Sequence, residues 1–349
     1  MNDLSIALAA LGVLVLTGVV VHGAWQARRA GPKRAADAVE PQLAHDPAEA
    51  APAEDSTSSA GADALRQAQA AAARRQMPRL DALIDALATI NVEAPLAGEM
   101  LLAHLPATRR AGSKPFWIEG QALGSGEWEV PVAGGVYREL QAGVQLANRK
   151  GALNEIEYSE FVQKVQSFAE GIGALVDFPD MIDVVARARE LDHFASQYDA
   201  QLAVQLQALG AAWSVGYIEQ HAIACGFKAG PLPGRMVLPA AEVGAPPLLT
   251  LGFDPQAALA DDPNVSSVRS VTLSFDVPQT AAAADPFAAW QASAHALAAA
   301  MEATVVDDRG RPLGDDSFTA IGRELQQLYR GLEARDLAAG SAAARRVFS

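Results

Sequence analysis

Residues 173–178 read GALVDF, and residues 303–308 read ATVVDD. Each short apolar run follows a stretch with helical character, Tyr158–Gly171 in the first case and Pro286–Ala300 in the second. Such a run predicts a strand, and Pro286 suits the first turn of a helix. A second helical stretch follows each run, with RARELDHF at 187–194 and GRELQQLY at 322–329. The repeated helix–strand–helix series predicts an α+β fold of two similar units.

The stretches before each series support the same division. RELQAGVQLANRKG (138–151) and RSVTLSFDVPQTA (269–281) both alternate apolar and polar residues, as does the run from Gln201 to Leu209. Period-two alternation predicts strands with one buried face. We therefore expect two tandem split β-α-β units, at 77–198 and 199–332, followed by a tail at 333–349. Helices should cover one face of each sheet and leave the other face free.

The first residues of the chain predict a membrane anchor. The stretch from Leu4 to Trp25 carries no Lys, Arg, Asp or Glu, and as a helix it would be about 33 Å long, enough for a ~30 Å hydrocarbon core. A cleaved signal peptide is the rival interpretation, but Asp3 stands where a basic region would be needed. Four basic residues follow the apolar run: Arg28, Arg29, Lys33 and Arg34. The positive-inside rule then predicts a single-pass protein with a periplasmic N-terminus and a cytoplasmic remainder.

A linker is expected between the anchor (1–26) and the first unit. Residues 27–76 begin with the basic cluster, and 35–61 are rich in Pro, Ala, Glu, Asp and Ser without an apolar period. This composition predicts disorder. The following stretch, 62–76, is rich in Ala, Gln and Arg, which favours a helix.

Composition and motifs argue against several functional classes. The net charge is −14, and the basic residues form no long run outside the juxtamembrane cluster, so nucleic acid is not expected as a partner. ALGSG at 122–126 is not followed by Gly-Lys-Ser/Thr and is no phosphate-binding loop. The histidines are scattered singly, and Asp307–Asp308 is best explained as a capped turn before Gly310. We expect no enzymatic activity, no metal and no cofactor.

The second unit resembles the C-terminal domain of the ZipA family of bacterial division proteins. The resemblance rests on VTLSFDVPQT (271–280), on the helix after it, on VVDDRGRPL (305–313) and on the last helix, 318–332. It covers about 199–332, and the anchor and linker match the family layout. The first unit is a degenerate repeat that the family pattern lacks.

The resemblance implies a function in division septum assembly at the bacterial inner membrane. ZipA-like proteins bind the C-terminal tail of FtsZ, the tubulin-like division polymer, in a shallow apolar groove on the exposed sheet face and so tether it to the membrane. The residues that the resemblance places in this groove are Leu202, Met236, Gly252, Phe253, Thr272 and Ser274.

The strand at 271–280 departs from the family pattern. Ser274 stands where the family has a large aromatic residue, and Thr272 and Asp276 make the same face polar, whereas Leu273, Phe275 and Val277 should face the helices. The matching face of the first unit is also polar. Two alternatives therefore stay open: a protein of the same fold with another protein partner, and a membrane-tethered sensor that binds a small molecule between the two sheets.

Overall fold

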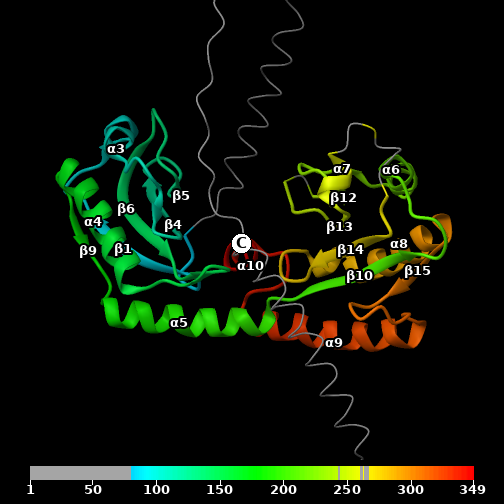
Figure 1. Ribbon diagram of the computed structural model, residues 1–349. Helices are drawn as coiled ribbons and strands as arrows, with labels where there is room; N and C mark the ends of the chain where they lie inside the picture. Colours follow the sequence, from blue (N-terminus) through cyan, green and yellow to red (C-terminus); the bar gives the residue numbers. More distant parts are fainter. Residues whose placement is uncertain (1–79, 243, 260–261, 263–266) are drawn as a thin grey trace, which may run out of the picture. The chain divides into compact units, whose positions relative to one another are not determined.

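The computed structural model describes residues 80–242, 244–259, 262 and 267–349. Leu80–Ser349 forms one compact unit, drawn in colour in Figure 1. The predicted anchor, its basic flank and the linker lie outside the described residues. Of the helices within the described ranges, none has the length and apolar character needed to cross a membrane.

The first lobe (80–198) is one sheet with its helices. The strand order is β3-β4-β6-β1-β9, with β2 paired to β6 and β5 paired to β4. Its elements are β1 (Asp85–Asn91), β2 (Leu96–Ala97), α3 (Gly98–His104), β3 (Arg110–Ala111), β4 (Lys114–Ala122), β5 (Trp128–Glu129), β6 (Val136–Gln145), β7 (Ala147–Asn148), β8 (Gly151–Ala152), α4 (Glu155–Gly171), β9 (Leu175–Asp177) and α5 (Met181–Tyr198). The short pair β7–β8 forms a separate two-stranded sheet.

Helix α4 supplies much of the first-lobe core and is fixed at its start by its own sequence. Asn154 accepts hydrogen bonds from the backbone of Ile156 and Glu157, while the Glu157 carboxylate accepts from the Asn154 backbone. This capping box satisfies amides that would otherwise have no partner at the helix start. Phe161 then packs edge-on against Phe116 of β4, with the ring centres 5.6 Å apart.

The second lobe (199–333) has the sheet order β11-β12-β13-β14-β10-β15. Its elements are β10 (Gln201–Ala208), α6 (Val215–Ala224), β11 (Lys228–Ala229), β12 (Arg235–Leu238), β13 (Leu249–Gly252), α7 (Pro255–Ala258), β14 (Ser270–Asp276), the 3-10 turn η1 (Ala282–Ala284), α8 (Pro286–Ala300), β15 (Ala303–Val306) and α9 (Asp315–Glu333). Pro286 is in the first turn of α8, as predicted.

Trp290 of α8 is the centre of the second core. Its ring packs edge-on against Phe275 of β14 and Phe318 of α9, at centroid distances of 6.0 and 5.5 Å. Its indole N–H donates to the carbonyl of Leu273 at 3.0 Å, so the ring is buried without leaving a polar group unpaired. These contacts place α8 and α9 on the same face of the second sheet.

The two lobes share a strand order. The short strands at the heart of the two repeated runs, β9 and β15, each pair antiparallel with the first strand of their lobe, β1 and β10. That first strand pairs on its other side with the long strand, β6 or β14. The predicted mixed α+β class is confirmed, and the two repeated runs occupy equivalent positions in their sheets.

The segment 334–349, expected as a tail outside both units, is packed into the molecule. It leaves α9, passes Pro278, whose carbonyl accepts a hydrogen bond from the Gly340 backbone at 2.8 Å, and forms α10 (Ala342–Val347). Val347 and Phe348 are each 1% exposed and belong to the first-lobe core. We call residues 334–349 the strap. The expected tail, 333–349, is corrected accordingly: Leu337, Ala344, Val347 and Phe348 are buried in the first-lobe core.

Candidate functional site: the open face of the second sheet

Strand register determines which side chains of the second sheet face the helices. Met236 lies opposite Leu251, Leu251 opposite Leu273, and Leu273 opposite Val204, so these four form one row across four strands. All four are buried and lie in the same hydrophobic core as Trp290. Because side chains alternate between faces along a strand, their neighbours in sequence point to the opposite side.

The opposite side is the candidate binding surface, which we call the open face. In register, Ser274 lies between Ala203 and Thr250, and Thr272 lies between Gln205 and Gly252. Ala203, Gln205 and Thr272 are exposed, Thr250 and Gly252 are half-buried, and Ser274 is buried next to Gln201, which donates to its hydroxyl at 3.3 Å. On β12, exposed Arg235 lies opposite Gly252 and half-buried Val237 opposite Thr250, so both continue these rows. The residues named here carry hydroxyl, amide and guanidinium groups, and Val237 is the largest apolar side chain among them.

The predicted groove residues separate onto two faces. The structure brings together Gly252, Thr272 and Ser274 on the open face. Met236 is 3% exposed and Phe253 is 8% exposed, and both are core residues. Leu202 pairs with buried Phe275 and packs against the same core. The expected placement of Leu202, Met236 and Phe253 in an exposed groove is therefore wrong, because strand alternation turns their side chains toward the helices.

One end of the open face is bounded by an ionic group. Arg149, which follows β7 in the first lobe, donates to Asp276 at 2.6 Å and forms a two-nitrogen contact with Asp199 at 2.6–3.1 Å. Burial raises the pKa of the Asp276 carboxyl above its ordinary value, and the arginine opposes that shift. Sequence reasoning identified Asp276 as polar but gave no signal for its partner, which is 127 residues away in the chain.

The corresponding face of the first sheet is covered at one corner. Phe116 of β4 contacts α4, so its neighbour Trp117 faces the other way, and there the guanidinium of Arg346 lies 4.5 Å from the centre of its ring. Arg346 also forms a buried ion pair with Asp85, and Gln145 donates to the Arg346 carbonyl at 2.7 Å. The strap thus occupies a surface that the sequence predicted to be free.

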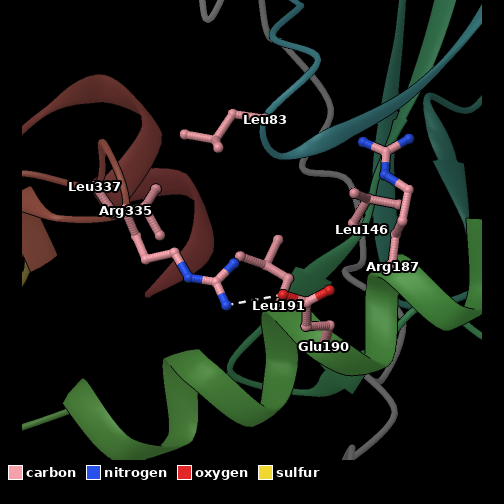
Figure 2. A pocket seen from close by; sticks show the side chains of 7 residues that line it. All are labelled: Leu83, Leu146, Arg187, Glu190, Leu191, Arg335 and Leu337. Atoms are coloured by element: carbon pink, nitrogen blue, oxygen red, sulfur yellow. Dashed lines mark hydrogen bonds and ion pairs between the residues drawn. The ribbon is translucent and has the colours of Figure 1, made fainter. Parts of the chain in front are cut away.

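A small surface hollow lies beside α5 (Figure 2). Leu83, Leu146 and Leu337 line it, and the ion pair between Arg335 and Glu190, 2.8 Å long, crosses its rim. Its volume of about 90 Å³ has room for a few water molecules. In the part of the chain that the structure describes, no three His, Cys, Asp or Glu side chains gather as a metal-ligand set.

The turn at Asp307 has the structural role that the sequence indicated. One carboxylate oxygen accepts the backbone N–H groups of Arg309 and Arg311, at 2.9 and 2.8 Å, and the other pairs with the Arg311 side chain. Each acceptor is therefore used to hold the turn after β15.

No family model matches the chain, and no curated protein matches it.

Proposed function

We propose that this chain is a non-enzymatic adaptor, tethered to the bacterial inner membrane by residues 1–26, that binds the C-terminal tail of FtsZ and holds FtsZ filaments at the division septum. The observation that carries the proposal is the one-sided packing of the second sheet. Helices α6, α8 and α9 pack in one core with it, and on the opposite face Ala203, Gln205 and Thr272 are exposed. This arrangement agrees with the split β-α-β unit of the ZipA family.

The chemistry of the open face defines how the tail would bind. Hydroxyl and amide groups from Thr250, Thr272 and Gln205 offer hydrogen-bond partners to an extended peptide, and the small residues Ala203 and Gly252 let its backbone approach closely. Such a contact is weak for each domain. A filament carries many tails and the membrane many anchored domains, so each bound pair raises the effective concentration of the next tail near the next domain. Avidity then gives stable binding of the filament.

A second candidate is a protein of the same fold that binds a different protein segment. The polarity of the open face favours it, because the large apolar anchors that usually dominate peptide binding are core residues here, Met236 and Phe253 among them. The small hollow of Figure 2 gives little support to the sensor alternative.

A titration of the full-length chain in detergent micelles with the FtsZ tail peptide of the same organism tests the proposal. We expect saturable binding that Gln205→Arg, on the open face, weakens about tenfold or more. Gln327→Arg is the matched control, because Gln327 is equally exposed but lies on α9, across the sheet. Saturable binding that both variants retain would remove the open face as the site. Absence of binding at high peptide concentration would exclude FtsZ and leave the second candidate.

A further inference from the structure

Both sheets carry an acid and a glutamine side by side at the same corner. In the first sheet, Asp85 is the first residue of β1 and pairs in register with Gln145, the last residue of β6. In the second sheet, Gln201 is the first residue of β10 and pairs with Asp276, the last residue of β14. We call each pair an acid corner.

Each acid corner holds an arginine that comes from beyond its own lobe's sheet. Arg149, on the first-lobe side, pairs with Asp276 of the second corner, and Arg346, carried by the strap that follows the second lobe, pairs with Asp85 of the first. The two contacts differ in burial: the Arg149 side chain is 35% exposed, whereas the Arg346 side chain is 10% exposed and that of Asp85 is fully buried.

The first corner is built to recognise an arginine in a particular setting. The Asp85 carboxylate accepts hydrogen bonds from two nitrogens of the Arg346 guanidinium, one of them at 2.8 Å. The planar guanidinium lies over the Trp117 ring. Gln145 does not contact the guanidinium; its side chain donates to the backbone carbonyl of Arg346. A planar, forked cation suits all these contacts, and a lysine would lose the second Asp85 bond and the stacking. Immediately after the arginine, Val347 and Phe348 are buried.

The connection to this segment is exposed and simple. Glu333, Ala334, Arg335 and Asp336 are all solvent-exposed, and the chain then turns through Gly340 at φ +77° before α10. Leu337, just before α10, is 1% exposed and packs in the first-lobe core. No continuous helix or shared strand of the described chain holds α10; its contacts come from the first corner and from the second lobe, where Gln279 donates to the Phe348 carbonyl at 2.5 Å and Glu242 pairs with Arg345.

We propose that the first acid corner, with Trp117, is a docking site for a short helical peptide bearing arginine followed by an apolar pair, and that residues 341–349 of the strap occupy it as an intramolecular ligand. The site would hold this segment without covalent continuity. The inference does not depend on FtsZ as the partner.

Cutting the strap tests the docking site. A protease recognition sequence is inserted between Glu333 and Ala334 of the full-length chain in micelles, the chain is cleaved, and the retained segment is measured by mass spectrometry after gel filtration. We expect the cleaved segment to co-elute with the parent chain. Arg346→Gln should weaken its retention by about a hundredfold or more, because it leaves the buried Asp85 carboxylate unpaired.

Arg345→Gln is the matched control. Arg345 is the neighbouring residue on α10, but it pairs with Glu242, whose side chain is 63% exposed, and makes only a long 3.4 Å contact with the Gln279 carbonyl. Its loss should therefore change retention by less than about fivefold. Three results would overturn the proposal: loss of the segment from the cleaved parent, equal retention by Arg346→Gln and the parent, or unfolding of the parent on cleavage as seen by circular dichroism. The last would make the strap an integral part of the core.

Discussion

Met236 offers a direct test of which face of the second sheet binds and which face supports the fold. The side chain is 3% exposed and lies beside Leu251, which in turn lies beside Leu273. Truncation of a buried methionine to alanine costs about 2–5 kcal/mol, from lost transfer free energy and from the cavity left behind. A domain is typically stable by about 5–15 kcal/mol, so Met236→Ala should remove a large part of the second lobe's stability.

The measurement is urea unfolding at equilibrium, followed by tryptophan fluorescence, with Trp213 and Trp290 as the buried reporters in the second lobe. Val237→Ala is the control on the same strand. Val237 is half-buried and faces the opposite way from Met236, so its truncation should cost about 1 kcal/mol or less. At concentrations of urea where Met236→Ala remains folded, its affinity for a peptide bound on the open face should equal that of the parent.

Unfolding of Met236→Ala with the same free energy as the parent would contradict a core position for Met236. So would a variant that keeps its stability but loses peptide binding, since that pattern belongs to an exposed anchor. A loss of stability with unchanged binding by the folded fraction is the result that the register of β12, β13 and β14 requires.

Three further predictions concern other parts of the molecule. Burial disfavours ionisation of Glu157, but hydrogen bonds from Ser113 and the charge of Lys114 hold its pKa below the ordinary value. The loss of unfolding free energy caused by Glu157→Gln should therefore be largest above about pH 4.5 and shrink as pH falls through the folded-state pKa. Denaturation of the variant and the parent at a series of pH values would measure it. Gly340→Ala should loosen the strap, because Gly340 has φ +77° and an added Cβ would lie 2.4 Å from the Ala281 backbone; faster proteolysis after residue 333 is the measurement, and an unchanged rate would contradict it. Trp290→Phe should destabilise the second lobe by about 1–3 kcal/mol in urea, because the carbonyl of Leu273 loses its indole donor, and a cost near zero would mean that this bond contributes little.

The strands and helices of the repeated series could be predicted because they depend on local periodicity. The alternation at 201–209 and 269–281 and the short runs at 173–178 and 303–308 all correspond to strands, and the helix beginning at Pro286 starts where its sequence indicates. These signals repeat within about ten residues, so one stretch of sequence contains them entirely.

Which face of the sheet the Met236 side chain lies on could not be predicted in the same way. Met236, Val237 and Leu238 are three apolar residues in a row, and such a run does not say which member faces the core. Pairing with Leu251 and Leu249 of β13 decides it, and β13 was not among the predicted strands. The resemblance to the ZipA family supplied an alignment for this short strand but not its phase.

The strap was missed for a different reason. Residues 334–349 show no period, and their small residues are as compatible with a solvated tail as with a packed one. The partners that give Arg346 its role, Asp85, Trp117 and Gln145, are spread over the first lobe, more than 200 residues earlier. Only the folded chain brings them together.

The separation of Asp85 and Arg346 has a consequence for synthesis on the ribosome. The two residues are 261 positions apart, and at ~5–20 residues per second the arginine is made roughly 13–50 s after the aspartate. During that interval β1, β4 and β6 can already pair, but the Asp85 carboxylate must remain hydrated and the Trp117 ring uncovered. The nascent first lobe therefore exposes a charged, aromatic surface to chaperones and other chains until the last turn of helix arrives to cover it.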